Sequence, residues 1–208
     1  MIRAVLFDFD GTLTRPGAID FAAIKREIGC PADRPILEYI EGLGSAEEKA
    51  RAFHTLETVE LEAAKRSFPN DGAVEFLRLL AEKGIPRGII SRNGRISIET
   101  AIKNFDGISL HDFTFVLSRE NAGRPKPDPE GVLKAAELFG IPPADLLMIG
   151  DFYFDIQAGN RAGAVTAFLT NGAPLPVMDA RPDYVVSGLR ELEKAVAGGK
   201  IALHAMRR

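Results

Sequence analysis

The segment AVLFDFDGT, residues 4–12, ends in two aspartates that could do chemistry. Asp8 and Asp10 are separated by one residue, and Gly11 and Thr12 follow them directly. In a strand, side chains at positions i and i+2 point to the same side, so the two carboxylates would emerge together. Carboxylates this close repel each other unless a cation, a proton or several N–H donors compensate. The spacing therefore predicts that this point of the chain binds something.

Other polar residues follow apolar runs later in the chain. Ser91 ends the run PRGIIS, Lys126 lies in the loop RPKPDP, Asp151 ends LLMIGD, and Asp155 comes just beyond it. Aspartate oxygens are hard ligands suited to Mg²⁺, which in proteins typically takes one or two carboxylates plus waters and phosphate oxygens. A hydroxyl donor and a lysine charge are the groups that a phosphate needs beside such a metal. Together these residues predict a site for Mg²⁺ and a phosphorylated substrate.

The elements that must position these residues are short apolar runs that alternate with helical patterns. Five runs are expected to be strands and a sixth, DYVV, is a further candidate: residues 4–9, 86–91, 113–118, 146–151, 164–169 and 183–186. Strand–helix alternation with short links predicts right-handed crossovers and a parallel, doubly wound sheet. In that architecture functional groups collect at the carboxyl ends of strands, which is where the polar residues lie.

Two helices of the sheet region have readable start and stop signals. Asp71 is expected to cap the helix AVEFLRLLAEK, and Gly84 lies just past its end, where a left-handed residue is favoured. Asp128 followed by Pro129 predicts an N-cap and a proline at the first position of a second helix, EGVLKAAELFG.

One stretch breaks the alternation. From about residue 15 to 70 there is no convincing strand, and the helical segments include one that Ser45 and Glu48 open with a capping-box pattern. We expect a small helical cap at 15–70, inserted after the first strand, and a core at 1–14 and 71–208. Extra helices packed on the sheet are the alternative. A cation of the cap is a candidate for contacting the far end of the substrate: Arg15, Lys25, Arg26, Arg34, Lys65 or Arg66.

Composition limits the kinds of partner. The chain has 208 residues, 46% of them hydrophobic and 26% charged, and a net charge of -3, with no basic cluster for nucleic acid. Cys30 is the single cysteine, so no intrachain disulfide is possible and a reducing compartment is expected. No run approaches the ~18 apolar residues of a membrane span. We expect a cytoplasmic protein without a membrane or nucleic-acid partner; the sequence indicates no oligomeric state.

DFDGTLT, a serine after the second strand, RPKPDP and GDFYFD closely resemble, in this order, the four motifs of haloacid dehalogenase-superfamily phosphatases. The resemblance spans nearly the whole chain, and the helical insertion resembles the smaller cap of phosphoglycolate-phosphatase-like members. It implies a three-layer, Rossmann-like α/β core with a small all-helical cap, and a Mg²⁺-dependent phosphomonoesterase that acts on a small phosphorylated metabolite.

The resemblance also implies roles for individual residues. Asp8 would be the nucleophile that forms an aspartyl-phosphate, and Asp10 would be the general acid and base. Asp8, the backbone carbonyl of Asp10, and Asp151 would hold Mg²⁺. Other residues would support them: Ser91, Lys126 and backbone N–H groups near Gly11 and Arg92 would hold the phosphoryl group, Asp155 would orient metal waters or Lys126, and Thr12 would brace the turn.

The sequence departs from the family pattern in one place and leaves other functions open. Arg92 and Asn93 follow Ser91, whereas many relatives have an asparagine directly after the hydroxyl residue, so Arg92 or Asn93 is expected to contact the substrate differently. A phosphotransferase or sugar phosphomutase would use the same aspartyl-phosphate, although the short cap favours hydrolysis. Dehalogenation is disfavoured by Asp10. A non-catalytic phospho-acceptor or binding module is a further alternative.

Overall fold

A computed structural model describes residues 2–198 and 201 of the chain. Six strands form one parallel sheet: β1 Ala4–Phe7, β2 Arg87–Ile90, β3 Val116–Leu117, β4 Leu146–Gly150, β5 Val165–Leu169 and β6 Tyr184–Val186. The six runs expected to be strands are therefore strands. Within the described residues, no helix combines the length and the apolar character that crossing a membrane requires.

The strand order is β3-β2-β1-β4-β5-β6, so the order reverses at β1. β1 pairs with β2 on one side and with β4 on the other. In such sheets ligands bind outside the carboxyl ends of the strands at the point of reversal. The loops after β1, β2 and β4 therefore meet where a site is expected.

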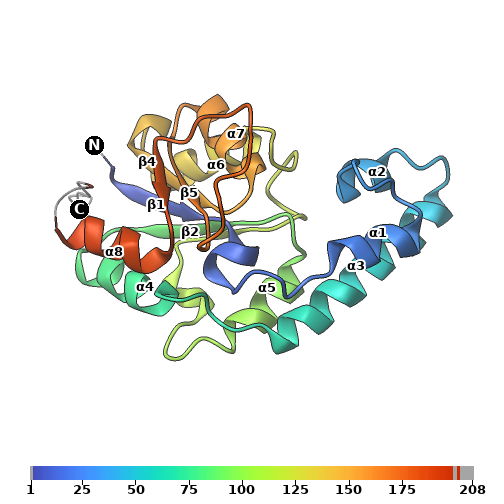
Figure 1. The fold of residues 1–208 in the computed structure, drawn as a ribbon, viewed down its shortest axis with the longest axis horizontal. Helices are drawn as coiled ribbons and strands as arrows, with labels where there is room; N and C mark the ends of the chain where they lie inside the picture. Colours follow the sequence, from blue (N-terminus) through green and yellow to red (C-terminus); the bar gives the residue numbers. More distant parts are fainter. Residues whose placement is uncertain (1, 199–200, 202–208) are drawn as a thin grey trace.

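Helices cover both faces of the sheet (Figure 1). On one face pack α4 Ala73–Glu82, α5 Arg95–Ile102 and α8 Leu189–Ala197, and on the other pack α6 Glu130–Phe139 and α7 Tyr153–Ala162. β1 shows why, because Val5 and Phe7 contribute to the first core and Ala4 and Leu6 to the second. A strand that is apolar on both sides needs cover on both sides. The three-layer core is thus confirmed.

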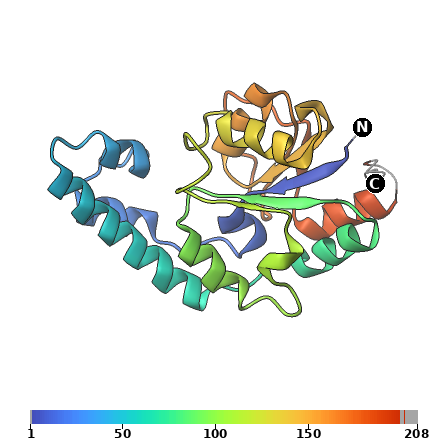
Figure 2. The ribbon, with the colours of Figure 1, turned by 180° about the vertical axis from the view of Figure 1, so that it is seen from behind.

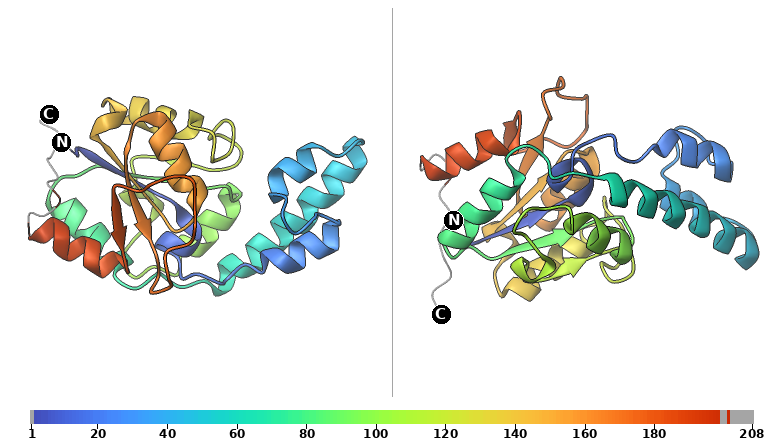
Figure 3. Two further views of the ribbon diagram at one scale, coloured as in Figure 1. Left: turned by 45° about the horizontal axis from the view of Figure 1, so that its top comes forward. Right: turned by 90° about the horizontal axis from the view of Figure 1, so that it is seen from below.

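The helical cap, residues 21–66, extends from the carboxyl-end side of the sheet (Figures 1, 2 and 3). It consists of α1 Phe21–Ile28, α2 Ile36–Glu41 and α3 Ala46–Arg66, which share a small apolar core of their own. Ser45 and Glu48 form the expected capping box at the start of α3. The C-terminal half of α3 packs against α5, which connects the cap to the sheet region (Figure 2).

The capping residues predicted for α4 and α6 are found only in part. Gly84 has the left-handed φ of 64° that was expected after α4. Asp71 does not cap that helix: Gly72 precedes it, and the Asp71 carboxylate instead accepts a hydrogen bond of 2.8 Å from Arg190 of α8. Asp128 does accept a hydrogen bond from the Glu130 N–H, at 3.0 Å, but α6 begins after Pro129 rather than at it. At Asp71 the long-range ion pair with Arg190 is formed in place of the predicted helix cap.

The last strand, β6, lies where DYVV predicts it, and α8 follows it. Residues 199–200 and 202–208 of the predicted core range lie outside the described residues.

Candidate active site

The turn after β1 presents the two aspartates. Asp8 is extended and buried, and its N–H donates a hydrogen bond of 2.8 Å to Ile149 of β4. Residues Phe9–Leu13 form a short helical turn that is kinked at Asp10 and Gly11. Gly11 has a φ of 78°, and a Cβ there would lie 2.0 Å from an Asp151 carboxylate oxygen. Glycine is therefore required both for the backbone conformation and for the close approach of Asp151.

Two asparagines from distant segments hold this turn. Asn70 Nδ2 lies 3.2 Å from the Gly11 carbonyl and 3.0 Å from the Thr12 carbonyl, and Asn171 Nδ2 donates to the Gly11 carbonyl at 2.8 Å. Asn70 also donates to the side-chain oxygen of Asn171 at 2.9 Å. These contacts fix the turn at the Gly11 and Thr12 carbonyls.

The Thr12 hydroxyl does not brace the turn as predicted. It is buried and has no hydrogen-bond partner among residues 2–198 and 201. Thr14 takes that role, since its hydroxyl donates to the Phe9 carbonyl at 3.3 Å. Both residues lie in the same motif, and a threonine-rich turn does not show by its sequence which hydroxyl reaches a carbonyl.

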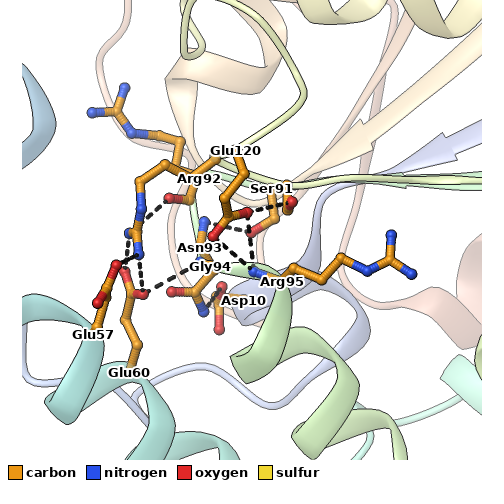
Figure 4. A network of polar contacts seen from close by, with 11 residues as sticks. Asp10, Glu57, Glu60, Ser91, Arg92, Asn93, Gly94, Arg95 and Glu120 are labelled. Atoms are coloured by element: carbon orange, nitrogen blue, oxygen red, sulfur yellow. Dashed lines mark hydrogen bonds and ion pairs between the residues drawn. The ribbon is translucent and has the colours of Figure 1, made fainter.

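The loop after β2 contributes Ser91 and Asn93, both buried (Figure 4). The Ser91 hydroxyl accepts a hydrogen bond of 3.0 Å from the Asn93 N–H, which leaves its own proton free to donate. Asn93 Nδ2 in turn donates to Asp10 Oδ2 at 2.8 Å.

Burial, followed by repulsion from Asp8 and Glu60, raises the pKa of Asp10 to about 8. Asp10 therefore carries a proton at neutral pH.

Lys126 is buried beneath the two catalytic candidates. Its Nζ lies 2.6 Å from Asp8, 2.6 Å from Asp155 and 3.1 Å from the Ile90 carbonyl. Burial alone lowers the pKa of Lys126, but attraction to Asp155 and Asp8 outweighs burial and raises it. Lys126 is thus a positive charge held between Asp8 and Asp155.

Three carboxylates converge near this lysine. Asp8, Asp151 and Asp155 each offer an oxygen, and the three oxygens lie within 4.8 Å of one another. Burial and repulsion from Asp8 raise the pKa of Asp151 to about 8, and burial raises that of Asp155 to about 6. Mg²⁺–oxygen distances of about 2.0–2.1 Å put opposite ligands roughly 4.2 Å apart. The cluster therefore fits a Mg²⁺ ion, whose charge would relieve the repulsion.

A second glycine makes this crowding possible. A Cβ on Gly150 would lie 2.2 Å from the Asp155 carboxylate, so α7 can begin directly against the end of β4. Asp155 also accepts a hydrogen bond of 3.1 Å from the Phe152 N–H at the start of α7.

The cap reaches the core through two buried or half-buried ion pairs. Arg92 donates to both carboxylate oxygens of Glu38 in α2, at 2.9 and 2.6 Å, and also to the Lys126 carbonyl. Glu60 of α3 accepts from Arg119 at 2.9 and 3.1 Å and from the Gly94 N–H at 3.3 Å (Figure 4). Burial raises the pKa of Glu60, and Arg119 opposes that rise.

A cavity of about 560 Å³ lies between the cap and the strand ends. Its floor includes five of the predicted site residues: Asp8, Asp10, Ser91, Lys126 and Asp151. Arg92, Asp155 and Lys25 line it too, and Lys25 is the one among the cap cations named above that does so within the described residues. Gly11 and Thr12 do not line the cavity, although Gly11 lies directly against Asp151, which does.

Three kinds of contact at the site were not predicted from the sequence. The roles of Asn70 and Asn171 depend on segments that meet only in the fold. Glu60 gave no signal, since it is one of many acidic residues on a long helix. For Asn93 the displaced asparagine after Ser91 was a signal, and its contact is with Asp10. The backbone N–H near Arg92 is predicted to help hold the phosphoryl group, and the guanidinium of Arg92 is engaged by Glu38.

Comparisons with known proteins agree with this geometry. The sequence model of the haloacid dehalogenase-like hydrolases matches residues 2–163. An uncharacterized hydrolase of Saccharomyces cerevisiae is 37% identical over 82% of this chain and 78% of its own length. A phosphoglycolate phosphatase of Thiobacillus denitrificans is 32% identical over 91% and 93%. The crystal structure of a hydrolase from Pseudomonas syringae superposes with a TM-score of 0.79 at 20% identity, covering 96% and 99%.

Proposed function

The chain belongs to the haloacid dehalogenase-like hydrolase family and is a phosphatase of that family, and on this basis we propose a specific reaction for it. It hydrolyses the phosphate monoester of a small metabolite with the help of Mg²⁺, through an aspartyl-phosphate on Asp8. The observation that carries the proposal is the convergence of Asp8, Asp10, Ser91, Lys126 and Asp151 on one cavity floor.

Asp8 attacks phosphorus in the first step. One of its oxygens is held by Lys126 at 2.6 Å, which leaves the other oxygen for attack. The P–O bond to the leaving group breaks as the bond from Asp8 forms, so the charge on the phosphoryl oxygens must be stabilised in the transition state. The Lys126 charge and the free Ser91 proton lie at the same floor and supply this stabilisation.

Asp10 handles the proton in both steps. With a pKa of about 8 it carries the proton that the leaving oxygen needs. After transfer it is a carboxylate, and it takes a proton from the water that attacks the aspartyl-phosphate, which returns Asp8 and releases phosphate. Asn93 holds Asp10 in place during both transfers.

Asp8 and Asp151 are the carboxylates that would hold Mg²⁺, with the backbone carbonyl of Asp10, and Asp155 would orient the surrounding groups. Bound Mg²⁺ would supply charge neutralisation between these carboxylates and the substrate phosphate. Lys126 pairs with Asp8 and Asp155, whereas the pKa of Asp151 is raised by burial and by repulsion from Asp8 and Asp155.

The test is phosphate release from a panel of phosphorylated metabolites, with Mg²⁺ or with EDTA, for the wild type and Asp8→Asn. Release that needs Mg²⁺ and is abolished by Asp8→Asn supports the proposal. Asp106→Asn is the matched control, because the side chain of Asp106 is fully exposed and far from the cavity lining. A new phosphate ester that forms when an acceptor alcohol is added, with no free phosphate released in its absence, would show a phosphotransferase or mutase instead.

A further inference from the structure

The cavity is larger than the phosphoryl chemistry requires. If the phosphoryl group and metal take about five water-sized volumes of ~30 Å³ each, roughly 150 Å³ is used. The cavity measures about 560 Å³, so most of it lies beyond the floor and is available to the leaving group. A small leaving group such as glycolate would leave much of this space unfilled.

The walls of that space are aromatic and aliphatic. Phe152 and Tyr153 at the start of α7 lie with ring centroids 4.4 Å apart, and Phe154 lies 4.5 Å from Tyr153. From the cap, Phe21, Ile36 and other apolar residues face the same cavity. Phe21 is 52% exposed and Phe152 is 50% exposed, although both line the site. Two large apolar side chains exposed at a binding cavity favour a ligand that covers them.

Carboxylates outnumber cations in the cavity lining. Lys126 pairs with Asp8 and Asp155, and Arg92 pairs with both oxygens of Glu38. Lys25 donates to the Ala32 carbonyl at 2.6 Å, and Asp33 lines the same cavity. Among the described residues, six carboxylates and three cations line the cavity, so a second anionic group beyond the phosphate would meet more like charge than opposite charge.

We propose that the substrate is the phosphate monoester of a bulky, uncharged alcohol with a ring-shaped apolar face, and that Phe152 and Phe21 cover this face from the core and from the cap. The inference rests on the phosphatase function proposed above. A sugar or cyclitol ring satisfies it through its C–H face, as an aromatic ring does. A leaving group with its own carboxylate or phosphate does not, because it would displace Glu38 or meet Asp33.

The first experiment measures binding rather than turnover, with three phosphonates that cannot be hydrolysed. Calorimetry on the Mg²⁺-loaded protein compares phenylphosphonate, 4-carboxyphenylphosphonate and phosphonoacetate. Phenylphosphonate is expected to bind about tenfold more tightly than either of the others, which corresponds to about 1.4 kcal/mol. Release of phosphate from phenyl phosphate and from 2-phosphoglycolate is measured on the same protein.

Variants then test the two residues. Phe152→Ala and, independently, Phe21→Ala are expected to weaken phenylphosphonate about tenfold relative to inorganic phosphate, which is too small to reach the wall. Phe68→Ala is the control, since Phe68 is 60% exposed and does not line the cavity. Circular dichroism establishes that each variant is folded. If one of Phe152→Ala and Phe21→Ala does not fold, the other still tests the proposal.

The outcomes separate the two proposals. Phosphonoacetate binding as tightly as phenylphosphonate, or wall variants with an unchanged ratio of affinities, would overturn the assignment of the leaving group whether or not the protein hydrolyses esters. Tight binding of phenylphosphonate without phosphate release from any ester would support the assignment and refute the hydrolase mechanism.

Discussion

Asn93 donates a hydrogen bond of 2.8 Å to the carboxylate of Asp10 at the carboxyl ends of β2 and β1. The contact joins the loop after the second strand to the turn after the first. Because it holds the carboxylate of Asp10, the contact makes Asn93 a positioning residue for the proton donor.

Asn93→Ala should lower kcat by roughly tenfold or more while KM changes little, because Asp10 loses the partner that orients it. Steady-state kinetics with phenyl phosphate measure this. Asn93→Asp should cost more, since it places a like charge beside Asp10. A kcat for Asn93→Ala equal to that of the wild type would refute the positioning role.

Asp10→Asn should let a covalent intermediate accumulate. An activated ester such as 4-nitrophenyl phosphate needs little help from an acid, so Asp8 is still phosphorylated, whereas the attacking water loses its base. Intact-protein mass spectrometry after an acid quench should show added phosphate on Asp10→Asn and not on Asp8→Asn combined with it. Equal labelling of both proteins would place the phosphoryl group elsewhere.

Glu60→Ala should destabilise the protein by about 2–3 kcal/mol, because the largely buried Arg119 loses its shortest ion pair and keeps only a longer one of 3.6 Å to Glu57 beside a hydrogen bond of 3.4 Å to the Arg92 carbonyl. Urea unfolding measures the change. Glu47→Ala removes an exposed ion pair with Arg51 and should change stability by no more than about 0.5 kcal/mol. Similar effects of the two substitutions would contradict a buried link between cap and core.

Metal-free protein should lose stability as pH rises from about 5 to about 8. Asp10, Asp151 and Asp155 have folded-state pKa values raised to about 8, 8 and 6, above the ordinary 3.8. The folded state therefore holds more protons than the unfolded state in this window, so its stability is fully present below pH 4 and is lost as the pH passes these values.

Thermal melts in EDTA at several pH values test this. Asp151→Asn should flatten the dependence, and Mg²⁺ should restore stability at the alkaline end while releasing protons on binding. A melting temperature in EDTA that rises between pH 5 and 8 would contradict the raised pKa values.

Much of the fold was predictable because its signals are local. Each buried strand is a short apolar run, and a strand that is apolar on both faces indicates helices on both sides, as Leu6 and Phe7 illustrate. The polar residues at the strand ends were predictable for the same reason. Parallel strands place their carboxyl ends at one edge, so Asp8, Ser91 and Asp151 had to lie together.

Contacts between distant segments were not predictable from pattern. Asp71 is a sound N-cap residue by type, yet an arginine 119 positions later takes its carboxylate. Thr12 and Thr14 are equivalent by type, and only the kink of the turn decides which hydroxyl reaches Phe9. The engagement of Arg92 by Glu38 requires the cap to be placed, which no spacing in the sequence gives.

The chain leaves the core and returns to it at one place. Thr14 and Pro69 form an antiparallel bridge, and Asn70 donates its N–H to the Leu13 carbonyl at 2.7 Å. Insertion or loss of sequence between these points leaves the ends already joined, so it does not disturb β1 or its turn. In evolutionary terms, the segment between these points can change in length and composition while the turn that carries Asp8 and Asp10 stays closed.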